Sequence, residues 1–225
     1  MRISIIIPVV NESAQILKTL LPLQVMRQRG AEIILVDGGS SDNTPDIARQ
    51  YVDAVVVSPR GRARQMNAGA RVATGEVFWF LHADTLVPDN ADVLIREKTQ
   101  TGAFLWGWFQ VSLSGTGLSF QLIGFMMNLR SRLSAIATGD QGIYIGKQTF
   151  ITVGGYPDIL LMEDIEISKR LSKIQRPFVI HHKIVTSSRR WEKNGVLRTV
   201  FLMWLLRLAY FLGVSPSKLR EWYES

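Results

Sequence analysis

Short apolar runs alternate with segments of helical spacing over residues 1–82, and this alternation constrains the fold more than any other feature. The runs are rich in β-branched and aromatic residues and are followed by turn formers, which is typical of strands. The expected strands are 3–7, 32–37, 54–57 and 76–82; the expected helices are 12–29 (interrupted at Pro22), 45–51 and 61–73. This order predicts an α/β fold in which helices cover both faces of a mostly parallel central sheet.

The second half of the chain is less regular. We expect a strand at 107–113, a helix at 117–133, a turn and strand at 138–146, a helix at 163–175 and a strand at 178–180. The chain has 225 residues and 47% apolar content, with no repeat or linker that would divide it. It is therefore expected to form one domain.

Positive charge is concentrated towards the C-terminus. Residues 169–225 carry +9 and residues 1–168 carry −2, within a net charge of +7. Such a segment attracts the phosphates of an anionic lipid, a nucleic acid or a diphosphate ligand, or is simply a solvated basic face. The chain has no cysteine, and its N-terminus does not resemble a signal peptide, so we expect a cytoplasmic protein.

Residues 196–214 form a strongly apolar segment. As a helix it would extend over about 28 Å, close to the thickness of a bilayer core. Arg198 and Arg207 would each cost roughly 2.5–3.5 kcal/mol at mid-membrane, which argues against a membrane span. We expect a helix that packs partly on the domain and partly on a membrane surface or a partner, with a simple core helix as the alternative.

Acidic residues follow several expected strands or begin a later helix. Glu12, Asp37 and Asp84 follow strands, and Glu163 and Asp164 begin a helix. Each alone is typical of a turn or a cap. Because ligands of open α/β sheets bind at the carboxyl ends of strands, the acids together indicate a site for a cation or a hydroxyl-rich ligand. Oxygen ligands suit Mg²⁺ or Mn²⁺, which usually bridge to substrate phosphates.

Motifs in a fixed order resemble those of a known family. The chain contains, in order, SIIIPVVNE (4–12), ILVDGGSSDNT (34–44), FLHADT (80–85) and MEDIEISKRL (162–171). They are similar to motifs of the inverting, nucleotide-sugar-dependent glycosyltransferases of family 2. A small bacterial subgroup is matched by RGRARQMNAGA (60–70), TGDQGIYI (138–145), VGGYPD (153–158) and SRRWE (188–192).

The resemblance covers roughly residues 3–192 and implies a GT-A-type domain over 1–192. Its nucleotide-binding half would lie near 1–100 and its acceptor half near 101–192. Residues 193–225 would form C-terminal helices that face a membrane or a partner.

The resemblance also implies a donor site for a UDP-, dTDP- or GDP-linked sugar. Pro8, Val10 and Glu12 would line the nucleoside pocket, with Glu12 on the ribose. Asp37 would accept a hydrogen bond from the base, which favours uracil or thymine without excluding guanine. The remaining implied donor-binding residues are Arg60, Gln65, Asn67, His82, Asp84 and Arg190.

Asp84 matches the last acid of the family's DxD signature, the acid that binds a divalent cation, Mg²⁺ or Mn²⁺, beneath the diphosphate. We therefore expect an unpaired Asp84 carboxylate that is available to the cation. His82 stands where the first Asp of the signature usually lies. One carboxylate fewer predicts weaker metal binding, or a contact between His82 and the phosphates or ribose.

Asp164 matches the family's catalytic base, which takes the proton of the acceptor hydroxyl as its oxygen attacks the anomeric carbon. Arg190 would stabilise the charge on the leaving diphosphate. The residues implied near the acceptor or the donor sugar are Asp140, Gln141, Glu163 and Trp191.

Two features concern the acceptor. Processive members carry QxxRW, whereas Ser187 replaces the Gln here, and together with the short chain this predicts a single transfer per acceptor. The apolar segment beside a basic cluster predicts a lipid-like or membrane-borne acceptor, reached by peripheral contact with the inner face of the membrane.

Some residues are better explained as structural. His181 and His182 have no third ligand at metal spacing, so a zinc site is not expected. Trp106 and Trp108 lie two residues apart on one strand face. They are expected in the core, or alternatively in the wall of an acceptor pocket.

Two other functions stay open. A nucleotidyltransferase that makes nucleotide sugars would share the fold and the metal, but it needs a Gly-rich loop where the chain has VVNE (9–12). A non-catalytic protein that binds nucleotide sugars or a membrane surface would use the basic C-terminus and would not need Asp84 or Asp164. The sequence lacks the motifs of Rossmann dehydrogenases, P-loop NTPases and serine hydrolases, and it carries no nucleic-acid recognition signature.

Overall fold

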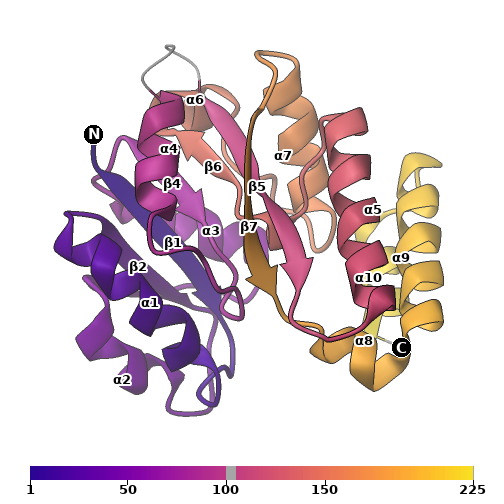
Figure 1. Ribbon diagram of the computed structural model, residues 1–225, viewed down its shortest axis with the longest axis horizontal. Helices are drawn as coiled ribbons and strands as arrows, with labels where there is room; N and C mark the ends of the chain where they lie inside the picture. Colours follow the sequence, from indigo (N-terminus) through magenta and orange to yellow (C-terminus); the bar gives the residue numbers. More distant parts are fainter. Residues whose placement is uncertain (100–104, 225) are drawn as a thin grey trace.

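The computed structural model describes residues 1–99 and 105–224, and its centre is a seven-stranded sheet (Figure 1). The strands are β1 (Ile3–Val9), β2 (Glu32–Asp37), β3 (Ala54–Val57), β4 (Val77–Phe80), β5 (Trp106–Leu113), β6 (Tyr144–Gly146) and β7 (Phe178–Thr186). They lie in the order β3-β2-β1-β4-β6-β5-β7. Among the strands described, β6 alone runs antiparallel to its neighbours. The expected α/β fold with a mostly parallel sheet is confirmed.

Helices cover both faces of the sheet. They are α1 (Ile16–Gln28), α2 (Thr44–Ala48), α3 (Arg62–Val72), α4 (Ala91–Thr99), α5 (Leu118–Ser134), α6 (Lys147–Thr152), α7 (Glu163–Ser172), α8 (Arg189–Asn194), α9 (Val196–Phe211) and α10 (Pro216–Glu224), with 3₁₀ turns η1 (Arg49–Tyr51) and η2 (Gly139–Gln141). The expected interruption of α1 at Pro22 is wrong, because the helix continues through it. Proline removes one intrahelical hydrogen bond, but Leu20, Leu23 and Met26 are fully buried and hold the helix on the sheet.

Successive residues of β1 alternate between two cores. Ile3, Ile5 and Ile7 pack in a core with α1 and α4, whereas Ile6 packs in a core with α3, α6 and α7. Both faces are therefore covered, which explains why the strand is a continuous apolar run. Trp106 and Trp108 are buried in the second core, as expected.

The two histidines lie within β7, which runs on to Thr186, and not at the end of a strand as expected. The pairing passes from Phe109–Ile180 directly to Gln110–Lys183, so His181 and His182 form a bulge and are exposed. An exposed bulge needs no metal to explain it.

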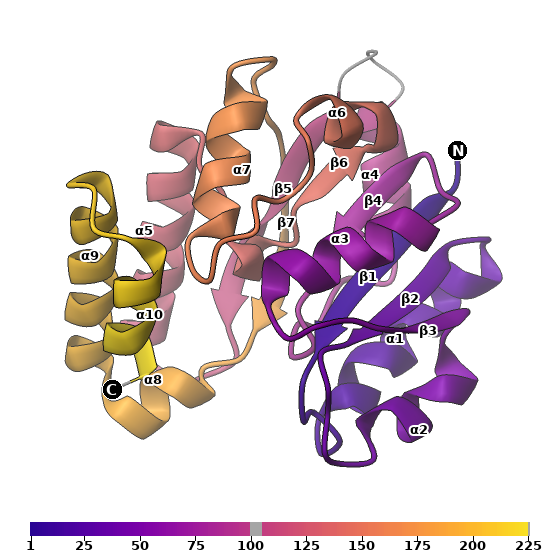
Figure 2. The ribbon, with the colours of Figure 1, turned by 180° about the vertical axis from the view of Figure 1, so that it is seen from behind.

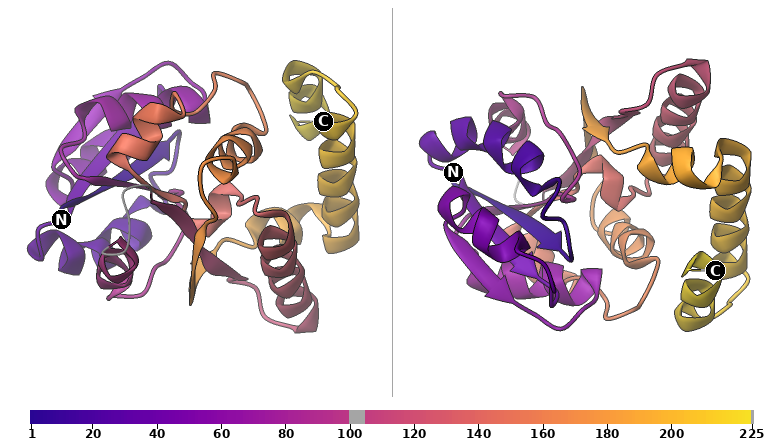
Figure 3. Two further views of the ribbon diagram at one scale, coloured as in Figure 1. Left: turned by 90° about the horizontal axis from the view of Figure 1, so that it is seen from above. Right: turned by 90° about the horizontal axis from the view of Figure 1, so that it is seen from below.

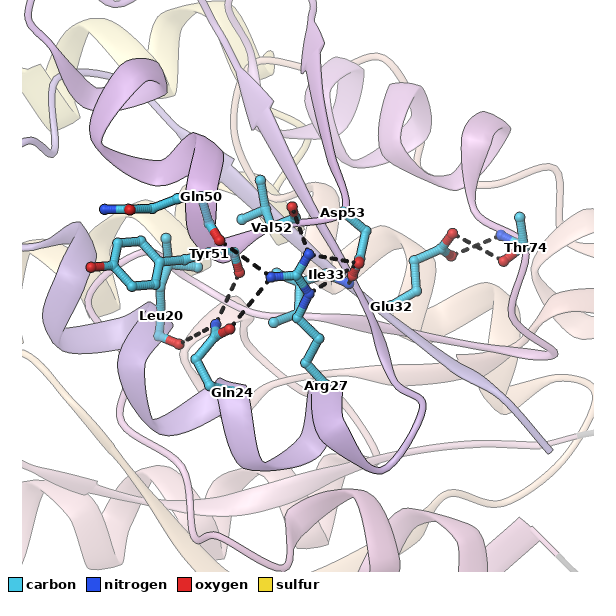
Figure 4. A network of polar contacts seen from close by, with 10 residues as sticks. All are labelled: Leu20, Gln24, Arg27, Glu32, Ile33, Gln50, Tyr51, Val52, Asp53 and Thr74. Atoms are coloured by element: carbon cyan, nitrogen blue, oxygen red, sulfur yellow. Dashed lines mark hydrogen bonds and ion pairs between the residues drawn. The ribbon is translucent and has the colours of Figure 1, made fainter.

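A polar network fastens the amino-terminal ends of β2 and β3 to α1 (Figure 4). Arg27 donates to Asp53 at 3.0 Å and to the Val52 carbonyl at 3.1 Å, and Asp53 also accepts from the Ile33 amide at 2.8 Å. The buried Glu32 accepts from the amide and the hydroxyl of Thr74, each at 2.9 Å. This edge of the sheet is thus held by the ion pair of Arg27 with Asp53 and by hydrogen bonds.

The C-terminal helices lie at the end of the molecule opposite β3 (Figure 2). A third apolar cluster joins Met162 and Ile165 of the α7 region to Leu206 and Ala209 of α9 and Leu219 of α10. The expected boundary after residue 192 falls inside α8, and the division of the chain into halves stays a prediction. Within the described residues, no helix combines the length and the apolar character needed to cross a bilayer.

Candidate active site

The carboxyl ends of the parallel strands meet at one edge of the sheet, and a cavity of about 310 Å³ lies there. Eight residues predicted from the sequence line it: Pro8, Val10, Glu12, Arg60, Gln65, His82, Asp84 and Glu163. The sequence analysis did not identify the other lining residues, which are Val9, Gly61, Arg62, Ala83, Leu160, Leu161, Arg220 and Tyr223. The cavity therefore combines carboxylates with several arginines.

The loop after β1 is held by the loop after β2. Asn11 has a left-handed backbone (φ 55°), which asparagine tolerates better than most residues. Its amide donates to the Ser40 hydroxyl at 3.0 Å, and its side-chain oxygen accepts from the Ser41 amide at 2.8 Å. The Glu12 amide donates to the Thr44 hydroxyl at 2.8 Å. These bonds direct Glu12 into the cavity.

Asp37 lies outside the cavity, where its carboxylate stabilises the turn after β2. It is 5% exposed, and its carboxylate accepts from the amides of Gly39 and Ser40 at 3.1 Å. Gln65 crosses behind this turn and donates to the carbonyls of Val9 at 2.9 Å and Val36 at 2.8 Å. The Gln65 amide thus joins the ends of β1 and β2 to α3.

Asp84 is ion-paired, so the expectation that its carboxylate is unpaired is wrong. The Arg189 guanidinium lies 3.4 Å from Asp84 Oδ2 and 3.7 Å from Glu12 Oε2. An antiparallel bridge between Leu86 and Val185, with both hydrogen bonds at 2.8 Å, brings the end of β7 beside the loop after β4. This bridge places Arg189 next to Asp84, although they are far apart in the sequence. Burial raises the pKa of Glu12, and Arg189 opposes that rise.

His82 pairs with Asp140 across the base of the site. His82 Nδ1 lies 3.2 Å from Asp140 Oδ1, and the His82 side chain is 13% exposed. Burial acts to raise the pKa of Asp140, but the hydrogen bond and charge of His82 and the charges of Arg62 and Arg130 lower it overall. Asp140 is therefore kept as a carboxylate beside the imidazole.

Glu163 and Asp164 occupy the first turn of α7. The Asp164 carboxylate accepts from the Gly139 amide at 3.0 Å, and both acids line a small cavity of about 10 Å³ next to the main one. Glu163 is 6% exposed; burial and the negative charge of Asp164 raise its pKa to about 7. Met162, just before them, has φ 71°, a strained backbone for a residue with a side chain.

Like Asp37 and Asp140, four other predicted site residues line neither cavity. Asn67 bonds the backbone of Tyr156 in both directions, at 2.7 and 3.0 Å. Gln141 is fully buried and accepts from the Ser131 hydroxyl at 2.7 Å. Arg190 stacks on the Tyr223 ring at 3.5 Å and donates to its carbonyl at 3.0 Å, and Trp191 beside it is half-buried. Arg190 thus does not line the cavity itself; it contacts and positions Tyr223, which does.

Some of the site residues that the sequence analysis did not identify lie within or beside a recognised motif, and others do not. Arg62 lies within RGRAR, and Arg189 directly precedes the Arg190 that the family motif matches. No local pattern indicates that Arg220 and Tyr223 return to the cavity, because that depends on how α10 packs. Over residues 1–99 and 105–224, no group of three or more His, Cys, Asp and Glu side chains could hold a metal ion.

Known proteins resemble this chain in sequence. The model of Glycosyl transferase family 2 matches residues 4–154. A poly-beta-1,6-N-acetyl-D-glucosamine synthase of Staphylococcus epidermidis is 28% identical over 242 residues, covering 99% of this chain, which spans 57% of that relative's length. An uncharacterized glycosyltransferase of Nostoc sp. is 32% identical over 108 residues, covering 45% of this chain and 34% of the relative.

Solved structures resemble it in fold. TarS of S. aureus (residues 1–349) superimposes with a TM-score of 0.65 at 18% identity, covering 84% of this chain and 61% of that chain. The mannosyltransferase PcManGT of Pyrobaculum calidifontis, in complex with GDP-Man and Mn²⁺, has a TM-score of 0.63 at 20% identity and covers 92% and 61%. At these identities the likeness shows the fold, which is of GT-A type. Since the family model covers more than half of the sequence, the chain belongs to glycosyl transferase family 2.

Proposed function

We propose that this chain transfers a sugar from a nucleotide-diphosphate donor to an acceptor hydroxyl, with inversion at the anomeric carbon. The observation that carries the proposal is the cavity at the carboxyl edge of the sheet, where Glu12, Asp84 and Glu163 gather with several arginines. The complexes of TarS with UDP-GlcNAc and of PcManGT with GDP-Man support a UDP- or GDP-linked donor, and a dTDP-linked donor stays a prediction.

In this proposal Glu12 binds the ribose, and Arg60 and Arg62 face the diphosphate. Arginine suits this role because its fork of N–H donors matches phosphate oxygens. Asp37 and Asn67 act indirectly, by holding the turn after β2 and the backbone of Tyr156.

The cavity offers two carboxylates to a divalent cation, Mg²⁺ or Mn²⁺, and this is a small but sufficient set of protein ligands. Asp84 is 31% exposed at the cavity and Glu12 is 28% exposed beside it, and Mg²⁺ needs only one or two carboxylates when substrate phosphates complete its shell. When bound, the ion would neutralise charge on the leaving diphosphate. Arg189 already contributes positive charge at the same carboxylates, so its guanidinium competes with the ion.

Catalysis is assigned to the first turn of α7. The acceptor oxygen attacks the anomeric carbon, its proton passes to the Asp164 carboxylate, and the bond to the diphosphate breaks with its electron pair on the diphosphate. Glu163 lies between Asp164 and the main cavity and orients the donor sugar or the acceptor, as do Asp140 and, behind it, Gln141. The Arg190 cation stabilises the donor side by supporting α10 through Tyr223, and Trp191 is assigned a place near the acceptor or the donor sugar.

Calorimetric titration of UDP, dTDP and GDP, with and without Mn²⁺, into the wild type and Asp84→Ala tests the donor site. We expect one diphosphate to bind more tightly with Mn²⁺ and to lose that gain in the variant. If none of the three binds with or without the metal, the proposed donor site does not exist.

The catalytic assignment is tested by comparing Asp164→Asn with Glu163→Gln. Asp164→Asn should abolish transfer while leaving diphosphate binding close to wild type, because its carboxylate lines only the small cavity. Full transfer by Asp164→Asn together with loss in Glu163→Gln would move the base to Glu163, whose pKa near 7 suits proton transfer.

The acceptor is proposed to be lipid-like, and the protein to work in the cytoplasm at the inner face of the membrane with a single transfer per acceptor. The apolar α9 and the basic residues around it support this acceptor class. Washing membranes with high salt and then with detergent checks the location. Finding the chain only in the soluble fraction, before either wash, contradicts it. Products with more than one added sugar would contradict single transfer.

A non-catalytic nucleotide-sugar-binding protein is the second candidate. The ion pairs of Arg189 with Asp84 and Glu12 favour it, because they supply a cation without a metal. Tight UDP binding without Mn²⁺, combined with no transfer to any membrane extract, would support this candidate over the enzyme.

A further inference from the structure

Helix α5 buries small and polar side chains and exposes large apolar ones, which is the reverse of an ordinary amphipathic helix. Its buried positions hold Gly124, Asn128 and Ser131. Six of its large apolar side chains are exposed instead: Leu118 (82%), Leu122 (61%), Phe125 (61%), Met126 (44%), Leu129 (38%) and Leu133 (80%). Their spacing of three and four residues puts them on one stripe of the helix. A stripe of this kind is not left to water without a partner.

Helix α9 repeats the arrangement. It buries Thr199, Leu206 and Ala209. Its exposed stripe consists of Leu197 (84%), Phe201 (70%), Trp204 (68%), Leu208 (58%) and Phe211 (54%), followed by Leu212 (76%) just after the helix. The two helices lie together at the same end of the molecule in the front, back and top views (Figures 1–3).

The charged residues of these two helices have one sign. They are Arg130 and Arg132 on α5 and Arg198 and Arg207 on α9, and neither helix contains an Asp or Glu. Arg132 and Arg198 are exposed beside the apolar stripes. The surface therefore combines exposed Leu, Phe and Trp side chains with the exposed arginines Arg132 and Arg198, and no acid lies on either helix.

We propose that the exposed stripes of α5 and α9 form a docking surface for a lipid bilayer that contains anionic headgroups. The apolar side chains enter the boundary between headgroups and acyl chains, and the arginines bind lipid phosphates. Trp204 and Phe201 have the amphipathic or bulky rings that favour this boundary. Because α9 is about 24 Å long, the helix lies on the bilayer and does not cross it.

Charge distinguishes a bilayer from a second copy of the chain as the occupant. A symmetric dimer through this surface would bring the arginines of both copies together, with no acid on α5 or α9 to compensate them. A bilayer with anionic headgroups supplies the missing negative charge.

The surface is connected to the candidate active site. Helix α8, which contributes Arg189, leads directly into α9, and α10, which contributes Tyr223, follows it. A membrane-docked α9 would therefore hold the cavity close to a membrane-borne acceptor. This use of the surface rests on the proposed function, whereas lipid binding itself does not require sugar transfer.

Flotation with vesicles tests the surface. The full chain is mixed with vesicles of phosphatidylcholine alone, or of phosphatidylcholine with phosphatidylglycerol, and UDP binding is measured on the same preparations. We expect binding to the anionic vesicles only or preferentially. The pairs Phe125→Ser/Leu129→Ser on α5 and Phe201→Ser/Trp204→Ser on α9 should each weaken it roughly tenfold or more. Arg132→Gln/Arg198→Gln should reduce the preference for anionic lipid.

The controls are Val57→Ser, at an apolar position that is 79% exposed on β3, and Arg49→Gln, an exposed arginine far from α9; both should bind vesicles like the wild type. The wild type failing to bind either vesicle, or the apolar variants binding unchanged, would overturn the proposal. So would a wild-type dimer that the same variants convert to a monomer without any vesicle binding. Vesicle binding without UDP binding would leave the docking surface standing and count against the proposed donor site.

Discussion

At the scale of single residues, the guanidinium of Arg189 lies between two carboxylates that the sequence assigns to nucleotide and metal. Its side chain is 51% exposed, so water screens the two ion pairs and each is weak. Such pairs can be displaced by a more highly charged ion. The position of Arg189 thus changes the chemistry expected of Asp84 from a vacant ligand to one that must exchange partners.

Arg189→Gln should raise the affinity of the donor-free protein for Mn²⁺ by about three- to tenfold, because removing one screened positive charge changes binding by roughly 1 kcal/mol. Free Mn²⁺ measured by electron paramagnetic resonance reports this directly. Arg49→Gln, which removes an exposed arginine 3.6 Å from Asp46, is the matched control. Unchanged or weaker Mn²⁺ binding in Arg189→Gln would show that the guanidinium does not compete.

Glu163 should make the stability of the protein depend on pH. Its pKa is raised from 4.5 to about 7, so the folded state holds a proton that the unfolded state releases. The contribution of Glu163 to stability is therefore fully present below pH 4.5 and is lost as the pH rises towards 7. Glu163→Gln removes the penalty, and its Tm relative to wild type should rise across this interval by several degrees. Exposed Glu97→Gln is the control, and a Tm difference that is flat with pH would contradict the prediction.

At the scale of elements, the site depends on how closely α3 approaches the sheet. Gly69 faces β1 and β2, and a Cβ there would lie 2.5 Å from Ile6 Cγ2 and 2.9 Å from Val36 Cγ2. Glycine is therefore required at this crossing. The same helix carries Gln65 and Arg62 to the cavity, so its distance from β1 sets the width of the donor site.

Gly69→Ala should push α3 away from β1 and cost roughly 1–3 kcal/mol of folding free energy. Thermal unfolding should show the loss, and titration should show weaker UDP binding because Gln65 no longer reaches the Val9 and Val36 carbonyls. Val72→Ala, at an exposed position of the same helix, should change neither. Wild-type UDP affinity in Gly69→Ala would mean that α3 does not shape the donor site.

At the scale of the whole molecule, the last helix completes a cavity that the first half of the chain begins, because Arg220 and Tyr223 of α10 line it. Leu219 of α10 is fully buried against α7 and α9, and Tyr223 lies one turn further along the same helix. Anchoring of α10 by Leu219 thus controls whether Tyr223 reaches the cavity.

Leu219→Ala should loosen α10, since removing a buried Leu side chain costs about 2–5 kcal/mol of packing. We expect UDP affinity to fall several-fold as Tyr223 withdraws, with a smaller fall in Tm because the helix can detach without global unfolding. Lys218→Ala, exposed on the same helix, is the control. A lower Tm with unchanged UDP affinity would show that α10 contributes stability but not binding.

The sequence alone determined the α/β fold class, most of the strands and the acids at the strand ends. These follow from local properties: hydrophobic periodicity reports the period of an element, and turn formers mark where it ends. Six of the eight predicted residues that line the cavity lie at or shortly after the end of a strand, whereas Gln65 lies on α3 and Glu163 begins α7.

Only the tertiary structure decided which partners these residues meet. Arg189 reaches Asp84 because Leu86, in the loop after β4, forms a bridge with Val185 of β7. Tyr223 reaches the cavity because α10 packs on α7. The sequence predicted a helix at 117–133, but it did not predict that the apolar stripe of α5 would be exposed. Local patterns encode which face of an element is apolar, but the packing of distant elements decides whether that face is covered.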